Sequence, residues 1–297
     1  MNAKQTKLLI LAAFALIVAA GVVIAMRHSP APQSAPARPP APAQAPAPAP
    51  APKPVVVRTV EPPVADPILA KARAYLGDEA ALDSLISIRM TGKMETGRYT
   101  AGGRVPVKRD IEIIYQKPCQ QRIVATDTDM IELTALDDYT GWQRVQSLAK
   151  EKRWRMNLLT RDQVKRLRAY TWENLNFYRG IERRGGRVEV VGPAKVGTAD
   201  AVKVAFIYEP SIVYYRYFDP ATGRLILTET TEGGRITQEG EIRVGGIRFP
   251  SVITQVAKAK DASGAVVDNP IVITLDRITI NERYPDSYFE VPTVRPR

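Results

Sequence analysis

The side chains that most often perform catalysis are scarce in this sequence. The only histidine is His28 and the only cysteine is Cys119, so residues 66–297 contain no imidazole. This excludes Ser-His-Asp and Cys-His catalysis and the usual histidine-containing zinc sites in that part of the chain. A lone cysteine also excludes an internal disulfide, so the fold has to be stabilised by its apolar core.

Two pairs of aspartates are the remaining candidates for acid–base chemistry. Asp137 and Asp138 are adjacent, and neighbours on a strand point to opposite faces, so these two carboxylates are not expected to share a proton. Asp127 and Asp129 are two residues apart, but their surroundings favour a turn in which aspartate accepts backbone hydrogen bonds. No catalytic constellation emerges. We therefore expect a protein that is not an enzyme and that needs no cofactor or metal.

The basic residues are concentrated in one stretch of the chain. The net charge is +11, and residues 150–168 contain eight Lys or Arg against two acidic residues. Such a run indicates an anionic partner, for example a lipid headgroup or a membrane surface. The alternative is the solvated face of a helix. Nothing in the sequence predicts a nucleic-acid partner.

The N-terminus predicts export across a membrane. Leu8–Met26 is an uncharged run of 19 residues, preceded by Lys4 and Lys7. This length just spans a bilayer as a helix, and the basic flank keeps the N-terminus in the cytoplasm. The alternative is a cleaved signal peptide, because Val18-Ala19-Ala20 offers the small residues that a signal peptidase needs. Either interpretation places the following residues outside the cytoplasm.

Three segments follow from this pattern. Residues 1–27 form the membrane anchor or signal peptide, and residues 28–65 form a tether. Within the tether, residues 30–54 contain 11 Pro and 9 Ala, a composition that supports neither helix nor sheet. Residues 66–297 form the folded domain. The expected localisation is the inner membrane as a single-pass protein with its C-terminal domain in the periplasm, or the periplasm itself if the signal is cleaved.

The folded domain is predicted to be mostly β. Asp66-Pro67 opens a short helix, and Thr160 with Gln163 fits a capping box that begins a long helix over Leu159–Tyr178. From Ile86 onward apolar and polar residues alternate, as in strands. The main candidate strands are Val105–Gln116, Arg122–Thr128, Met130–Leu136, Trp142–Gln146, Val188–Val191, Ala201–Tyr208, Val213–Phe218, Arg224–Thr231, Ile236–Val244, Ile247–Ala257 and Ile271–Ile280.

Short turns such as Gly233-Gly234 and Gly245-Gly246 separate the later strands, so the sheet should be an antiparallel meander. A sandwich and a single curved sheet both fit this many strands. The long helix between two groups of strands favours the second: a strongly curved antiparallel sheet, or incomplete β-barrel, with covering helices and an N-terminal transmembrane helix. The hollow under such helices suits a greasy ligand.

Several segments together resemble the periplasmic outer-membrane lipoprotein-sorting family, also called lipoprotein carriers. They are Leu85–Met94, Asp138–Trp142, Tyr217–Leu225, Gly246–Pro250, Ile278–Asn281 and Phe289–Pro292. The resemblance covers residues 68–292, and its motifs are turns and strand edges. It implies an open, incomplete β-barrel with a helical lid that binds acyl chains, in a family that carries lipoproteins, binds lipids or senses envelope stress. The anchor and tether set this chain apart from soluble carriers.

Apolar and aromatic side chains on the strands and the long helix are the candidates to line the hollow. They are Trp142, Trp154, Trp172, Val204, Phe206, Tyr208, Tyr215 and Tyr217. The alternative for each is an ordinary core position. The resulting function is binding of lipid or lipoprotein acyl chains in an apolar hollow, in lipoprotein sorting or lipid handling. The alternative function is a membrane-tethered interaction or envelope-stress sensor module with a protein partner in the envelope.

Overall fold

The computed structural model describes residues 67–100, 103–149, 153–261 and 263–293. The predicted membrane segment (1–27) and the predicted tether (28–65) lie outside these residues. Among the described helices, none is long and apolar enough to cross a membrane.

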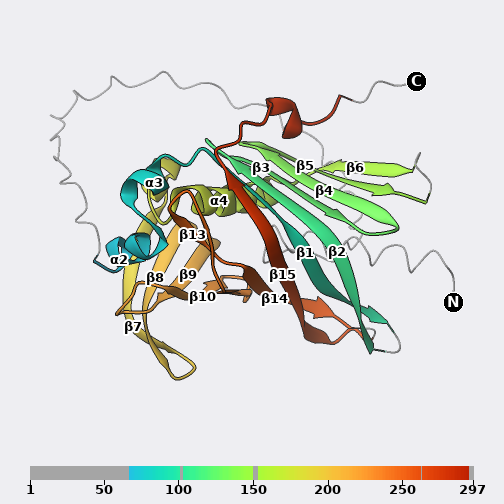
Figure 1. The fold of residues 1–297 in the computed structure, drawn as a ribbon. Helices are drawn as coiled ribbons and strands as arrows, with labels where there is room; N and C mark the ends of the chain where they lie inside the picture. The colour runs from blue at the N-terminus through green and yellow to red at the C-terminus, as the bar shows by residue number, and fades with distance from the viewer. Residues whose placement is uncertain (1–66, 101–102, 150–152, 262, 294–297) are drawn as a thin grey trace, which may run out of the picture. The chain divides into compact units, whose positions relative to one another are not determined.

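Thirteen strands form one antiparallel sheet, in the order β6-β5-β4-β3-β2-β1-β15-β14-β11-β10-β9-β8-β7 (Figure 1). The strands are β1 (Ser87–Thr100), β2 (Gly103–Gln116), β3 (Gln120–Thr126), β4 (Met130–Asp137), β5 (Thr140–Ser147), β6 (Trp154–Leu158), β7 (Arg187–Val196), β8 (Ala199–Glu209), β9 (Ile212–Phe218), β10 (Leu225–Thr230), β11 (Arg235–Glu239), β14 (Val252–Lys260) and β15 (Val266–Ile280). A separate hairpin pairs β12 (Ile242–Val244) with β13 (Ile247–Phe249). The sheet is not closed, because β6 and β7 end it without pairing to each other.

The described residues form few helices, of which α4 is the longest. They are α2 (Pro67–Leu76), α3 (Glu79–Asp83), α4 (Arg161–Asn176) and the 3₁₀ turns η2 (Ile181–Arg184) and η3 (Asp286–Tyr288). The predicted long helix is confirmed: Thr160 caps α4, and Thr160 and Gln163 form the capping box. The helix ends where Phe177 adopts a left-handed backbone with φ of 46°.

The connection from β6 to β7 explains where α4 lies. Strands β1 to β6 form one meander that runs outward from β1, and β7 to β15 form a second that returns to pair with β1. Since β6 and β7 are opposite edges, the chain between them crosses one face of the sheet, and α4 is that crossing (Figure 1). We call the face that carries α4 the inner face and the opposite one the outer face.

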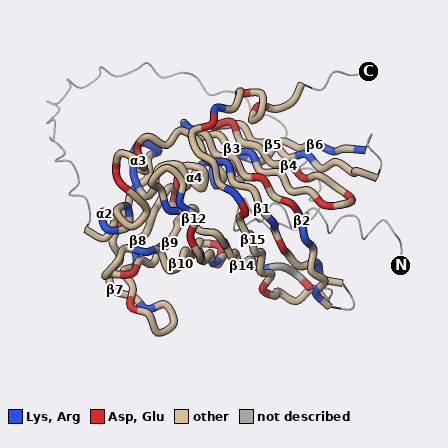
Figure 2. Tube along the Cα trace, in the orientation of Figure 1, with Lys and Arg blue, Asp and Glu red and all other residues tan. Residues whose placement is uncertain are grey.

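Alternation along the strands assigns side chains to the two faces. On β2, Ile111, Ile113 and Tyr115 are buried in one cluster with Leu167 and Leu175 of α4. A second inner cluster is formed chiefly by β8 and β9 with Ala169 of α4. Smaller clusters cover parts of the outer face. Lys, Arg, Asp and Glu are intermixed along β1 and β2 in Figure 2, as expected for strands with one solvated side.

Two predicted strands are each broken in the structure. Ile236–Val244 divides into β11 and β12, and Gly240 between them has a φ of 66°, which glycine tolerates. Ile247–Ala257 divides into β13 and β14 around Pro250, which cannot donate a ladder hydrogen bond. These breaks release the β12–β13 hairpin from the main sheet. Strand β6 was not predicted, because its five residues show no clear alternation.

Adding a methyl group at Gly223, in the turn between β9 and β10, is expected to destabilise the fold. Gly223 has a φ of 76°, and a Cβ there would lie 2.4 Å from the backbone carbon of Lys71 in α2. Gly197 has a similar φ of 59° but faces open space. We expect Gly197→Ala to lower the free energy of unfolding by about 1 kcal/mol. Gly223→Ala should cost roughly 1–3 kcal/mol more because it displaces α2. Urea unfolding measures both, and equal losses would contradict this packing.

Candidate functional site

The helix α4 lies between the two inner clusters and leaves a space beside it. Its side chains Val164, Leu167 and Leu175 pack with β1, β2 and β15, whereas Ala169 packs with β8 and β9. Val164, Leu167 and Leu175 share one side of the helix, whereas Ala169, two residues from Leu167, lies on another side, so a single helix contacts both halves of the sheet. The space between the halves that α4 does not fill is an apolar cavity.

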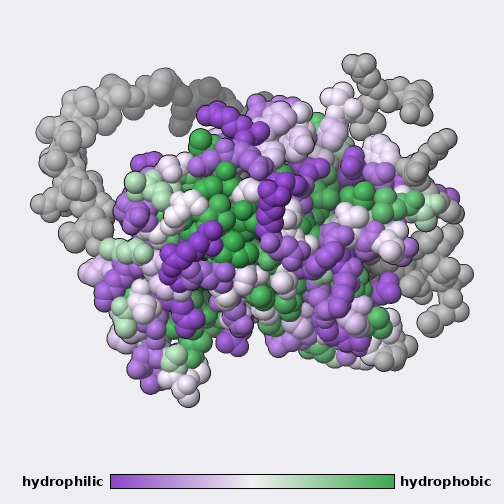
Figure 3. All heavy atoms as spheres, in the orientation of Figure 1, coloured by the Kyte–Doolittle hydropathy of each residue, from purple (hydrophilic) through white to green (hydrophobic). Residues whose placement is uncertain are grey.

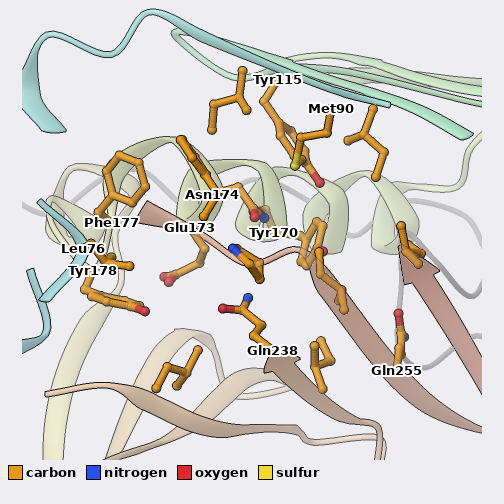
Figure 4. A pocket seen from close by; sticks show the side chains of 18 of the residues that line it. Leu76, Met90, Tyr115, Tyr170, Glu173, Asn174, Phe177, Tyr178, Gln238 and Gln255 are labelled. Carbon is orange, nitrogen blue, oxygen red and sulfur yellow. The ribbon is translucent and has the colours of Figure 1, made fainter. Parts of the chain in front are cut away.

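The cavity has a volume of about 100 Å³ and is lined by 19 residues from both halves of the sheet, α4 and the β12–β13 hairpin. Fourteen are apolar or aromatic: Leu76, Ile88, Met90, Ile113, Tyr115, Tyr170, Phe177, Tyr178, Leu225, Ile236, Phe249, Pro250, Ile253 and Ile273. Figure 4 shows Tyr170 on α4 and Phe177 directly after its end, with Met90 and Tyr115 on one side and Gln238 on the other. Apolar residues also gather at the surface around α4 and β13 in Figure 3.

A buried ion pair forms part of the cavity wall, which also includes the polar side chains Asn174, Gln238 and Gln255. The guanidinium of Arg216 on β9 contacts the carboxylate of Glu173 on α4, and only 11% and 3% of these side chains are exposed. The hydroxyl of Tyr208 donates a hydrogen bond to the same carboxylate. Arg216 also lies over the rings of Tyr178 and Phe206, at 4.9 Å and 4.8 Å from their centroids. The pair therefore ties α4 to the β8–β9 half of the sheet.

The surroundings of this pair favour the charged form of Arg216 and the protonated form of Tyr208. Burial is the largest influence on Arg216 and by itself would lower its pKa, but Glu173 and the neighbouring Tyr178, Tyr208 and Tyr214 together outweigh it, so the pKa of Arg216 lies above its ordinary value. Burial and the neighbouring Glu173 together raise the pKa of Tyr208, so this hydroxyl stays protonated and remains a donor. Among the described residues, Nε of Arg216 has no hydrogen-bond partner.

None of the eight side chains predicted to line the hollow lies in the wall of this cavity. Val204, Phe206 and Tyr208 are on the inner face, in the cluster beside it. Their role toward a ligand stays a prediction.

The other predicted side chains lie elsewhere. Trp172 is buried on α4, where its indole nitrogen donates to the carbonyl of Arg179. Tyr215 and Tyr217 belong to an outer-face cluster, and Trp142 belongs to another, with its indole bonded to the carbonyl of Phe289. Trp154 is 47% exposed on the edge strand β6. Whether any of them contacts a ligand also stays a prediction.

Sequence reasoning missed Arg216 as a cavity residue, because alternation along a strand does not show which of its two sides faces α4. Tyr214, Arg216 and Phe218 share the inner face, whereas Tyr215 and Tyr217 share the outer one. Period-two alternation was visible in the sequence, but not which of the two sets faces α4. An arginine between buried aromatic residues was the available signal for a charged group in the cavity wall.

The residues first considered for catalysis have structural partners. Asp127 accepts hydrogen bonds from the backbone amides of Asp129 and Met130, which confirms the predicted turn. Asp138 pairs with Arg168 and Arg184. Burial raises the pKa of the Cys119 thiol to about 11, so it is protonated at neutral pH. In the described part of the chain, no group of three or more His, Cys, Asp or Glu could hold a metal ion.

No family model and no curated protein matches this sequence. Solved structures to which the chain is similar include an outer membrane lipoprotein-sorting protein domain from Vibrio parahaemolyticus, with 11% identity, a TM-score of 0.47 and coverage of 74% of this chain and 95% of that one. A LolA superfamily protein from Nitrosomonas europaea has 12% identity, a TM-score of 0.48 and coverage of 75% and 96%. A DUF1329 family protein from Desulfovibrio piger has 9% identity, a TM-score of 0.46 and coverage of 75% and 95%.

The first of these neighbours carries the family name that the sequence motifs resemble. Identities and TM-scores this low support no argument about what the chain does. The cavity and its side chains are therefore the basis of the function proposed below.

We expect the ion pair at the cavity to be strongly coupled. Arg216→Met leaves the carboxylate of Glu173 buried without its cation, which should lower the free energy of unfolding by about 3–5 kcal/mol. The double variant Glu173→Gln/Arg216→Met should recover part of this loss, because no unpaired charge remains. Urea unfolding followed by tryptophan fluorescence measures each value.

The matched control for the ion pair is Lys195→Met. Lys195 pairs with Asp200 at 2.9 Å on the surface, where 68% and 76% of the two side chains are exposed. That exposed pair should contribute little that is measurable. A double variant no more stable than Arg216→Met alone would argue against the coupling of Glu173 to Arg216.

Proposed function

We propose that residues 66–297 bind an acyl chain of a lipid or lipoprotein in the cavity beside α4. The observation that carries the proposal is the lining: fourteen apolar or aromatic side chains from both halves of the sheet and from the segments that cover it face one space, and the five polar side chains among them include a buried ion pair. Pockets for small apolar ligands have this composition, an apolar wall with a few fixed polar groups.

The volume of the cavity limits how an acyl chain could enter it. A cavity of about 150 Å³ holds a molecule such as benzene, and this one is smaller, at about 100 Å³. An acyl chain therefore needs the walls to move apart. The β12–β13 hairpin is the wall best suited to move, because it supplies Phe249 to the lining but shares no ladder with the main sheet.

The proposed role is binding rather than catalysis. The charged groups at the cavity, Arg216 and Glu173, already neutralise each other and hold α4 in place. Such a pair can orient the polar end of a ligand without reacting with it. In the cell, the proposed setting is the periplasm, where lipoprotein sorting or lipid handling supplies acyl chains. This setting rests on the export signal predicted from Leu8–Met26.

A second candidate function is a protein-interaction or sensor module. Strand β6 is an edge of the sheet, and it exposes Trp154 by 47% and Leu158 by 65%. An edge strand with unpaired backbone groups and apolar side chains can accept a strand from another protein. This candidate predicts a stable protein partner in the envelope and no lipid in the cavity.

A tryptophan placed in the cavity tests the first function. Ile236 on β11 lines the cavity, whereas Thr237 is the next residue on the same strand and points to the opposite face. Ile236→Trp fills the space, so lipid retained by the purified full chain should fall by about tenfold or more, a change of about 1.4 kcal/mol. Native mass spectrometry before and after delipidation measures the retained lipid.

The control Thr237→Trp adds the same ring outside the cavity and should leave lipid retention unchanged. Wild-type protein that retains no lipid from a lipid-containing preparation would contradict the proposal. Equal retention by the two tryptophan variants would do so as well. Either result would favour the interaction module, whose partner cross-linking would then identify.

A further inference from the structure

A second recess, separate from the apolar cavity, is lined by basic side chains. Its volume is about 290 Å³, and it lies among α4, η2, β8 and β9. Four cationic residues contribute to its wall: Lys165, Arg168, Arg183 and Arg184. Four cations in one recess create a positive potential that attracts anions.

Local geometry brings these four residues together. Lys165 and Arg168 are three positions apart on α4, so they share one side of the helix. Gly180 and Gly185 have φ values of 74° and 76° and flank η2 on both sides. These left-handed positions turn the chain sharply at each end of η2. The second pair of arginines, on η2, thereby joins the residues of α4 around one recess.

The protein itself supplies only part of the balancing negative charge. Asp138 accepts from Nε of Arg168 and from Nη1 of Arg184, both at 3.2 Å and both through the same oxygen. Nζ of Lys165 lies 2.7 Å from the carboxylate of Glu209. The exposed guanidinium of Arg183 has no partner among the described residues. Four cations and two carboxylates leave an excess of two positive charges.

Two of the guanidinium groups of the recess lie over aromatic rings. Arg168 lies 3.7 Å above the ring centroid of Tyr139, and Arg184 lies 4.5 Å above that of Trp172. A guanidinium stacked on a ring keeps the N–H groups at its edge free to donate. Each of these arginines uses one nitrogen on Asp138, so most of its five N–H donors remain for a ligand.

From this arrangement we infer that the recess binds a phosphomonoester group, as free phosphate or as the head of a lipid such as phosphatidic acid. A phosphomonoester carries a charge of about −1.5 to −2 at neutral pH and three acceptor oxygens. That charge matches the excess of two, and the planar donors of arginine match phosphate oxygens. A single carboxylate would neutralise only half of the excess.

The recess and the apolar cavity are neighbours, yet they function independently in this inference. Tyr208 lines the recess, and its hydroxyl binds Glu173, which lines the cavity. One phospholipid could reach both, but phosphate binding in the recess does not require an acyl chain. Ile236→Trp, which fills the cavity, should therefore leave phosphate binding unchanged.

The experiment compares two charge reversals in the full chain. Arg183→Glu removes the unpartnered cation of the recess. Arg277→Glu makes the same charge change on β15, at an exposed residue that does not line the recess. Calorimetry measures the affinity for inorganic phosphate at low salt. Co-sedimentation with phosphatidylcholine vesicles, with and without phosphatidic acid, measures binding to the lipid head.

We expect Arg183→Glu to weaken binding of the phosphate group by about tenfold or more. Arg277→Glu should change this binding by less than about twofold. Weakened binding of inorganic phosphate would identify a site for the free anion. Weakening confined to vesicles with phosphatidic acid would identify the lipid head. Equal effects of both variants, or no effect of either, would overturn the inference. Melting temperatures check folding, and Arg183→Ala replaces Arg183→Glu if the reversal unfolds the chain.

Discussion

The link between β6 and β7 has to cross the inner face, because these two strands are the opposite edges of one thirteen-stranded sheet. The helix α4 is that link, and it meets both halves of the sheet along its length. This single helix does not fill the whole space between the two halves of the sheet. The apolar cavity, the buried ion pair and the basic recess all adjoin α4 for this reason.

A charged pair inside an apolar wall is costly unless both partners are present. Glu173 and Arg216 tie the middle of α4 to β9, while Tyr208 fixes the orientation of the carboxylate. The desolvation of two charges is offset only by their close contact and by the surrounding rings. The pair therefore contributes more to the position of α4 than to the net stability of the domain. By contrast, the β12–β13 hairpin covers the cavity without any ladder to the main sheet, so that wall is held by the packing of side chains such as Ile247 and Phe249.

The two proposed sites suit the two parts of an amphiphile, its apolar tail and its charged head. The cavity offers apolar carbon surface, and the recess offers cations, two of which lie over aromatic rings. Tyr208 borders the recess and bonds to a residue of the cavity wall. The basic run at residues 150–168 thus acquires a more specific interpretation. Arg166 pairs with Glu232, whereas Lys165 and Arg168 join the arginines of η2 around one recess.

Local features of the sequence determined most of the strands and the limits of α4. The capping box at Thr160 and Gln163, the alternation along β2 and the aspartate turn at Asp127 are all decided within a few residues. Only the tertiary structure decided which alternate set of β9 residues faces α4, and so placed Arg216 inside and Tyr217 outside. That choice depends on pairing between strands far apart in the chain and on the path of the crossing helix. Neither is encoded in the spacing of nearby residues.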